Sequence, residues 1–399
     1  MSTDATDTPS HAQSAGPVVQ EVVGPPLSAW EAGAALAMGV VSLLLAGTMP
    51  VLLGALAADH RLAVGNIGDT AMAEALVMGL VTALCSALLR PRRLRVAGFV
   101  AILALAAIDL AMLRAGGLGV VALRALAGAA EGVLLWITIG MIARTATPER
   151  WAGIFYTALT LGQFVLAAVL TGLVMPRWGV NGCFALVAGL VAASAVVALF
   201  GRNAYAALPD GGAGGGLPPR RGLIALAGTL LFAAAFQALI VYAVPLALQA
   251  RLSPAVAGVA VTASLAAQIA GGGLAAALAG RVHYFTVFVF ASLGALACWA
   301  VYLFWPPAWL FIAASMAAGL IYMVATPFLV PMTIEADPSR RAAIQSGGVQ
   351  LFGAALGPFL ASRVVDGAAV HAVVILGSWL LLGGLTIFGV LHLTSRRTV

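Results

Sequence analysis

Two ionisable residues interrupt one long apolar stretch, LRALAGAAEGVLLWITIGMIAR, which covers residues 123–144. Arg124 and Glu131 are seven residues apart, so on a helix they lie on one face, two turns from each other. An ionised side chain at the centre of a bilayer costs about 3 kcal/mol on insertion scales, and it persists where it faces a partner or a cavity. If this stretch spans a membrane, the pair points to proton handling or solute binding.

Two more acids fall in neighbouring apolar runs. Glu74 is about nine residues, and Asp109 about four, from the predicted outer end of its run. The Cα atoms of Arg124 and Glu131 should be roughly 10 Å apart along the helix axis, which disfavours a direct salt bridge. We therefore predict that Glu74 or Asp109 pairs with Arg124. The place of Asp109 near the interface favours a solvated or capping role.

The predicted proton-coupling residues are Glu131, Arg124 and Glu74. In this hypothesis Glu131 releases its proton when water reaches it from one side, and Arg124 or the solute competes for the resulting charge. The structural alternatives are an ion pair or a permanently protonated core glutamate for Glu131, and for Arg124 a lock between the fourth and second spans.

Further polar and aromatic residues lie near the middle of other apolar runs. An array of amides, a phenol and an indole suits a small polar or amphipathic organic solute, so these residues are the predicted solute-binding set: Gln163, Gln237, Gln268, Tyr322, Gln350 and Trp136. The alternative for each glutamine is a hydrogen bond between helices, worth about 0.6 kcal/mol on average. The alternative for Trp136 is a position in the core or against lipid.

Composition places the whole chain in a membrane. Of its 399 residues, 62% are hydrophobic and only 9% charged, and the mean hydropathy is +1.06. Soluble domains carry about 25% charged residues. The apolar runs are continuous over about 20 residues, which indicates transmembrane helices and not barrel strands.

The hydropathy pattern predicts an all-α membrane protein with twelve transmembrane helices in two six-helix bundles. The spans are roughly 30–58, 65–89, 94–113, 117–143, 150–174, 180–200, 222–249, 253–279, 283–305, 307–334, 340–365 and 368–394. The domains are a disordered tail (1–28), an N-terminal bundle (29–200), a Gly- and Pro-rich linker (201–221), a C-terminal bundle (222–394) and a short tail (395–399). Pro50, Pro245, Pro327, Pro331 and Pro358 are expected to bend their helices.

The distribution of arginine predicts the orientation. Fourteen of the twenty arginines fall in the tails and in alternate loops that include the linker, and the opposite loops hold only Arg61, Arg114, Arg177 and Arg251. The positive-inside rule then places both termini and the linker in the cytoplasm, in the inner membrane of a cell. We read the arginine clusters as topology signals and expect no nucleic-acid partner.

Signatures of enzymes are absent from the sequence: it contains no phosphate-binding loop, HExxH or GxSxG motif. Cys85, Cys183 and Cys298 fall in apolar runs and read as buried small hydrophobes. His60, His283, His371 and His392 fall near span ends without the spacing of metal ligands. We expect no enzymatic activity, no cofactor and no metal, and a monomer whose partners are a solute, a proton and the lipid bilayer.

Four stretches resemble the major facilitator superfamily, and the likeness extends from Ala29 to Thr394. They are TMPVLLGALAADH with NIGDTAMAEALVMGL, the helix-4 pair Arg124 and Gly128, the turn PRWGVNGCFAL, and GAALGPFLASRVVDG with its GxxxGP pattern. Two features depart from the family pattern: the loop LLRPRRLR lacks the family's acid, and TALTLGQFVLAAVLTG lacks the Gly-Pro pair of drug–proton antiporters.

The resemblance implies a secondary transporter that works by alternating access and moves a small organic solute. It links the helix-4 arginine, Arg124, to proton handling, and it favours efflux over uptake. The alternatives are an uncoupled facilitator, an uptake symporter and a non-transporting membrane sensor of the same fold.

Overall fold

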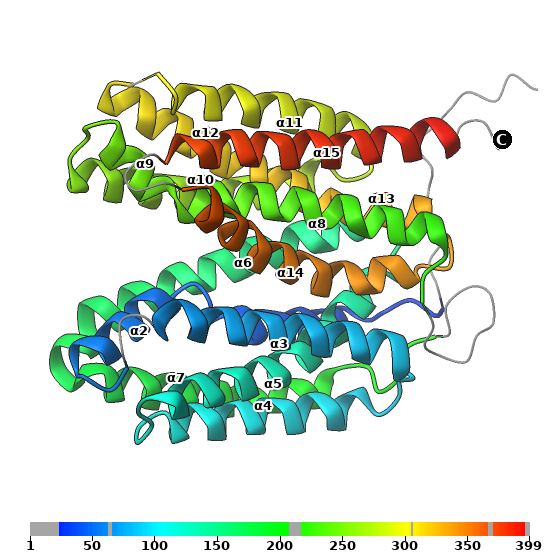
Figure 1. Cartoon of the computed structure of the whole chain (residues 1–399). Coiled ribbons are helices and arrows are strands. Elements are labelled where there is room, and N and C mark those ends of the chain that lie inside the picture. The colour runs from blue at the N-terminus through cyan, green and yellow to red at the C-terminus, as the bar shows by residue number, and fades with distance from the viewer. Residues whose placement is uncertain (1–23, 63–65, 207–216, 305, 366–369, 396–399) are drawn as a thin grey trace, which may run out of the picture.

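The computed structural model describes residues 24–62, 66–206, 217–304, 306–365 and 370–395, and nearly all of them are helical. Figure 1 shows the helices of the first half of the chain, in blue to green, beside those of the second half, in green to red. Most of the two predicted tails and the middle of the predicted linker lie outside the described residues.

The N-terminal half runs from α1 to α7. Its elements are α1 (Ala29–Leu43), α2 (Met49–Ala58), α3 (Asn66–Leu88), α4 (Leu94–Ala111), α5 (Leu118–Ile142), α6 (Pro148–Val169), the short π-helical segment η1 (Leu170–Val174) and α7 (Met175–Phe200).

The C-terminal half runs from α8 to α15. Its elements are α8 (Arg220–Val241), α9 (Ala243–Gln249), α10 (Pro254–Leu278), α11 (Tyr284–Val301), α12 (Ala308–Ala325), the 3₁₀ segment η2 (Thr326–Phe328), α13 (Leu329–Ala336), α14 (Arg341–Val364) and α15 (His371–Ser395).

Nine helical runs among the described residues are long and apolar enough to cross a membrane. One of them, Pro148–Phe200, has 53 residues and contains two passes, because the helix breaks at Gly179 with a φ of 63°. That left-handed conformation suits glycine, and the break lies in the predicted turn 176–186. With α14 and the pair α1–α2, the chain makes the twelve passes that the sequence predicts.

Two breaks in the helices lie close to proline residues. A proline ring clashes with the carbonyl group four residues earlier and offers no N–H group. Helix α8 ends at Val241, four residues before Pro245, and helix α12 gives way to η2 at Thr326, next to Pro327. The expectation that Pro245 and Pro327 interrupt their helices is confirmed.

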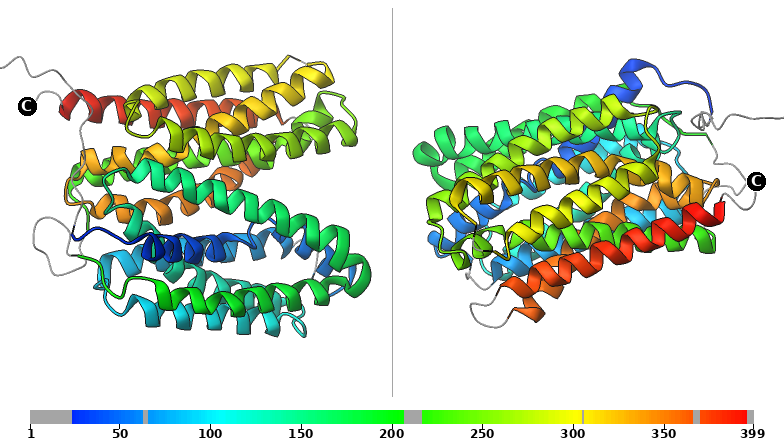
Figure 2. Two further views of the ribbon diagram at one scale, coloured as in Figure 1. Left: turned by 180° about the vertical axis from the view of Figure 1, so that it is seen from behind. Right: turned by 90° about the horizontal axis from the view of Figure 1, so that it is seen from above.

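Each half has its own apolar core, and the halves meet along a seam. On one side of the seam lie α3, α5 and α6, and on the other α10, α13 and α14: α14 packs on α3 and α5, while α6 packs on α10 and α13. The backbones come close at Gly348, where a Cβ would lie 2.8 Å from the carbonyl oxygen of Gly79. The left view of Figure 2 shows the two halves and this seam from behind.

One end of the molecule, which we call the linker end, carries the connection between the halves. Residues 201–206 pack against the loop between α3 and α4: Asn203 accepts a hydrogen bond from the Leu94 N–H at 2.9 Å, and Tyr205 N–H donates to Pro91 at 3.0 Å. The start of the predicted linker is therefore part of the packed N-terminal half.

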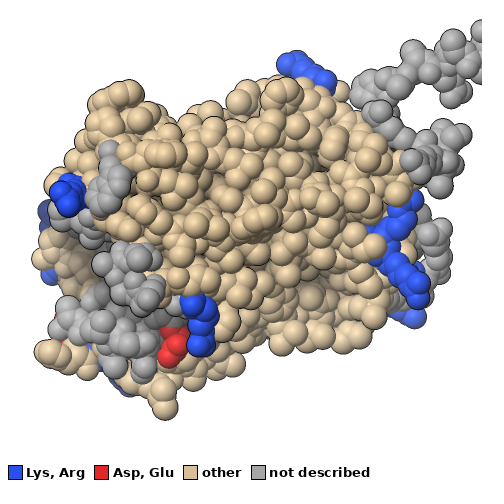
Figure 3. Space-filling model, turned by 45° about the horizontal axis from the view of Figure 1, so that its top comes forward, with Lys and Arg blue, Asp and Glu red and all other residues tan. Residues whose placement is uncertain are grey.

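The outer surface of the bundle is largely uncharged. Exposed apolar side chains include Phe290, Leu293, Trp379 and Leu393. On the face drawn in Figure 3, few charged side chains interrupt the broad surface between the two ends of the molecule. Such a surface suits contact with lipid, and the chain is a multi-pass membrane protein.

Candidate functional site

A buried ion cluster lies inside the N-terminal half, with Arg124 of α5 at its centre. The guanidinium holds both oxygens of Glu74 on α3, with Nε 2.9 Å from Oε2 and Nη2 bonded to Oε1. Its Nη1 lies 3.0 Å from Asp109 Oδ1 on α4, and its Nη2 lies 3.3 Å from Glu131 Oε1. All four side chains are at least 94% buried.

Local packing explains how three helices bring these groups together. A Cβ at Gly128 would collide with the carbonyl oxygen of Glu74, and a Cβ at Gly132 would lie 2.7 Å from that of Met78. The two glycines therefore let α5 approach the backbone of α3 closely. Gly128 lies one turn after Arg124 on α5. The close approach of α3 at Gly128 therefore brings Glu74 next to the guanidinium of Arg124.

The prediction that Glu74 or Asp109 pairs with Arg124 is confirmed for both acids. The prediction that Arg124 and Glu131 are too far apart for direct contact is wrong. Side chains on a helix lean toward its N-terminus, so Glu131 leans back toward Arg124 and the long arginine side chain spans the rest. The expected solvated or capping role of Asp109 is also wrong, because the residue is 1% exposed and bound to Arg124.

The cluster holds one cation and three carboxyl groups. If all three were ionised, its net charge would be −2 in a site without water contact. Two oxygens, Asp109 Oδ2 and Glu131 Oε2, are buried without a hydrogen-bond partner among the described residues. Buried charge without a partner is costly. A charge-balanced cluster carries two protons on its carboxyl groups, and the two unpartnered oxygens offer places for them.

Glu131 lies one helical turn from a contact across the seam. One turn further along α5 is Leu135, which with Ile139 faces Gly347 of α14: a Cβ at Gly347 would lie 3.8 Å from Leu135 Cδ2 and 2.9 Å from Ile139 Cγ1. Arg124 contacts Glu131 directly, so the cluster comes within one helical turn of the α5 residues that face the other half.

A second group of polar residues bridges the seam near the same depth. Tyr156 of α6 donates a hydrogen bond to Gln350 Oε1 of α14 at 2.8 Å. Tyr322 of α12 belongs to a second pair, which lies within the C-terminal half. Tyr322 accepts a hydrogen bond from Gln237 Nε2 of α8 at 3.3 Å. We call Tyr156, Gln350, Tyr322 and Gln237 the seam network.

The remaining residues of the predicted solute-binding set lie elsewhere. Gln163 donates to the Leu43 carbonyl oxygen at 2.7 Å, at the break between α1 and α2. Gln268 is buried in α10, and Trp136 is 6% exposed within the core of the N-terminal half. The structure therefore bonds Gln350 across the seam and pairs Gln237 with Tyr322, and it leaves the other three residues outside the seam network.

The halves are also joined at the linker end. Arg340, in the loop between α13 and α14, donates from Nη1 to the carbonyl oxygens of Ala143 at 2.7 Å and Thr145 at 3.4 Å, at the C-terminal end of α5. Nearby, Arg144 donates to Ala206, and burial lowers the pKa of Arg144 to about 10, so this guanidinium remains charged at neutral pH.

Sequence reasoning missed two residues of this arrangement. Tyr156 lies six residues after the start of its predicted span, 150–174, and so a search for polar residues at the middle of each span does not select it. The position of Arg340 in an arginine-rich loop indicates topology alone. Its signal was the neighbouring Asp337, which caps α14 through a 2.8 Å bond from the Ala342 N–H and thereby shapes the loop that presents Arg340.

Comparison with solved structures identifies the fold. No protein-family model and no curated protein matches the sequence. Among solved structures, the chain is similar to the transporter FucP in its outward conformation, with a TM-score of 0.69, 10% identity, and 89% of this chain and 98% of that chain covered.

Two further structures agree. The human organic anion transporter MFSD10 (TETRAN) has a TM-score of 0.66 and 14% identity, over 91% of this chain and 100% of that one. A variant of the E. coli fucose:proton symporter FucP has a TM-score of 0.69 and 11% identity, over 91% and 99%. The chain has the fold of the major facilitator superfamily, as the sequence motifs indicate.

Proposed function

We propose that this protein is a secondary transporter that couples a proton to the movement of a small organic solute by alternating access. The observation that carries the proposal is the ion cluster: one arginine, three buried carboxyl groups, and an unpartnered oxygen on Glu131, one helical turn from the seam. The fold supports a transporter, since the similar structures include a fucose:proton symporter and an organic anion transporter.

The mechanism follows from the charge count. When the seam opens and water reaches Glu131, its carboxyl group releases a proton and the resulting charge is held by Arg124 at 3.3 Å. When the seam closes, water leaves the site, and the low dielectric constant around Glu131 favours its protonated form, which restores the charge-balanced cluster. Binding of solute across the seam network would link these steps, because Tyr156 and Gln350 belong to opposite halves and separate when the seam opens.

The orientation of the molecule is part of the proposal. The linker end carries most of the arginines, so we place it and both termini in the cytoplasm of a cell with an inner membrane. In this proposed orientation, the bond from Arg340 to Ala143 joins the two halves on the cytoplasmic side. Efflux is the direction that we propose for the solute; uptake by symport and uncoupled diffusion are separate outcomes of the experiment below.

The test uses the full chain in liposomes that contain a pH-sensitive dye, with a panel of sugars, organic anions and amphipathic cations. Glu131→Gln removes the ionisable group and keeps the shape of the side chain. Glu31→Gln is the matched control, because Glu31 lies outside the cluster, pairs with Arg202 at 3.2 Å, and a glutamine can keep its role at the start of α1.

We expect solute-dependent proton movement in the wild type and in Glu31→Gln. In Glu131→Gln we expect solute exchange to continue while proton movement falls to background. Proton movement at the wild-type rate in Glu131→Gln would remove Glu131 from coupling. Solute movement without protons in the wild type would indicate a facilitator, and no solute movement at all would favour a sensor of the same fold.

A further inference from the structure

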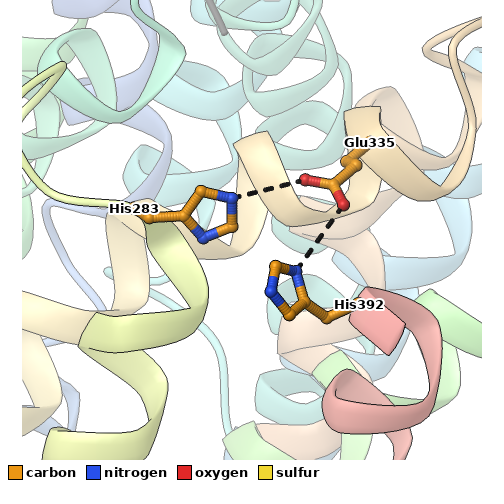
Figure 4. A group of neighbouring side chains, drawn as sticks. All are labelled: His283, Glu335 and His392. Carbon is orange, nitrogen blue, oxygen red and sulfur yellow. Dashed lines mark ion pairs between the residues drawn. The ribbon is translucent and has the colours of Figure 1, made fainter. Parts of the chain in front are cut away.

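Three potential metal ligands from distant parts of the sequence meet at the linker end of the C-terminal half. They are His283 at the start of α11, Glu335 near the end of α13, and His392 near the end of α15, and one ligand atom from each lies within 4.8 Å of the others. Figure 4 shows both imidazole rings directed at the carboxylate from either side. We call these three residues the histidine cluster.

The ligand atoms of the three side chains lie close to one another. His283 Nε2 lies 3.8 Å from Glu335 Oε2, and His392 Nδ1 lies 3.9 Å from Glu335 Oε1. These separations exceed hydrogen-bond length. They are close to the separation of about 3.3 Å between two atoms that bind the same tetrahedral zinc ion at about 2.0–2.1 Å, so small side-chain rotations suffice to bring all three onto one ion.

The surroundings hold the rings in place but leave an approach open. The ring of His392 stacks on Phe285, with centroids 4.5 Å apart and an interplanar angle of 16°, and the Tyr284 hydroxyl lies 3.5 Å from its Nδ1. The side chains of His283 and Glu335 are 41% and 29% exposed. An ion can therefore enter from the linker end, and water can complete its coordination.

We propose that the histidine cluster is a binding site for a divalent transition-metal ion of the zinc type. Two imidazole nitrogens and one carboxylate oxygen suit Zn²⁺, Co²⁺ or Ni²⁺, whereas Mg²⁺ and Ca²⁺ prefer sites built of oxygen atoms. The site is separate from the ion cluster, which lies in the other half of the molecule, and it stands whether or not the protein transports a solute.

Binding costs a hydrogen bond at each histidine. His392 Nδ1, which faces Glu335, gives up its 3.5 Å contact with the Tyr284 hydroxyl when it binds a metal. His283 Nδ1 accepts a hydrogen bond from the Phe285 N–H at 3.2 Å. When Nε2 binds a metal, the ring proton sits on Nδ1, so this bond at the start of α11 is lost. The affinity of the site is accordingly lower than that of a site whose histidines are already in the binding tautomer.

Binding also has a structural consequence, because the ion joins the ends of three helices. Glu335 follows Ile334, which packs into the core of the N-terminal half at the seam. An ion on Glu335 therefore holds the end of α13 beside the loop that carries Arg340. We expect hydrogen exchange of the backbone at the ends of α13 and α15 to slow when the site is filled.

The experiment titrates Co²⁺ and Zn²⁺ into the full chain, purified in detergent with a tag that contains no histidine and treated with a chelator. We expect one Co²⁺ per chain with a visible absorption band, displaced by Zn²⁺, and a rise in melting temperature with Zn²⁺. Mg²⁺ should give neither response.

Substitutions test which residues bind the ion. Glu335→Gln and His392→Ala should each weaken Co²⁺ binding more than about tenfold, the loss that even outer-shell changes can cause. A substitution at the buried His392 could prevent folding. His283→Gln is therefore a second variant, because a change at the partly exposed His283 is better tolerated. His371→Ala, at the far end of α15, is the matched control. Absence of one-to-one binding in the wild type, or wild-type affinity in Glu335→Gln and His283→Gln, would overturn the proposal.

Discussion

Arg340 offers the sharpest test of how the two halves close. It is 4% exposed, and its guanidinium reaches from the C-terminal half to two carbonyl oxygens at the end of α5 in the N-terminal half. These carbonyl groups form the negative end of the α5 dipole, so a cation there is favourable. Arg340→Ala removes this contact and leaves the loop cap made by Asp337 in place.

The expected magnitude follows from the contact. A hydrogen bond to a charged group contributes about 1.5–3 kcal/mol. Because the bond joins the halves at the linker end, it exists only while that end is closed. Its loss, taken as about 2 kcal/mol, should shift the ratio of closed to open molecules toward the open form by about thirtyfold.

The assay measures distances between two spin labels at the linker end. Leu89→Cys lies in the N-terminal half and Arg281→Cys in the C-terminal half, and both positions are exposed. The three native cysteines, Cys85, Cys183 and Cys298, are first replaced by alanine. Opening of the linker end adds a longer distance, whose fraction gives the ratio of open to closed molecules directly.

The neighbouring residue provides the control. Arg341→Ala removes the same charge one position later, and among the described residues no hydrogen bond from Arg341 to α5 is present. We expect its distance distribution to match that of the parent. If Arg340→Ala also matches the parent while the protein remains folded, the Arg340 contact does not hold the halves together and this reasoning is refuted.

Three other substitutions test the packing of the site. Arg124→Gln leaves three buried carboxyl groups without a cation, and we expect it to cost about 3–5 kcal/mol of unfolding free energy, measured by denaturant in detergent. Gly128→Leu should lower the melting temperature by forcing α5 from α3, whereas Gly119→Leu, with open space around it, should not. Tyr156→Phe removes the bond to Gln350, worth about 1 kcal/mol, and should open the labelled linker end about fivefold.

Much of the architecture follows from the sequence because its signals are local. Continuous apolar runs predict the passes, and Pro245 and Pro327 predict two of the breaks. The ion cluster could be anticipated in part, since the depths of Arg124, Glu74 and Asp109 follow from helix rise. The direct contact with Glu131 could not, because it depends on the direction in which a long side chain leans.

Contacts across the halves were beyond sequence reasoning for a physical reason. Tyr156 and Gln350 are 194 residues apart, and nothing local to either one indicates its partner. The histidine cluster shows the same limit: metal ligands are recognised in a sequence by close spacing, and here His283, Glu335 and His392 become neighbours only when α11, α13 and α15 pack. Depth along each helix predicts which residues share a layer, but not which of them touch.

The acid missing from the loop between α3 and α4 finds an explanation in the same contacts. That loop is held by the start of the linker, through Asn203 and Tyr205, and so it does not need a carboxylate of its own. Asp337, in the loop after α13, caps α14 within the C-terminal half. The link between the halves then passes to Arg340, a cation set against the carbonyl end of α5. Arg340 belongs to the loop that follows α13, so this contact between the halves depends on the end of α13, where the histidine cluster lies.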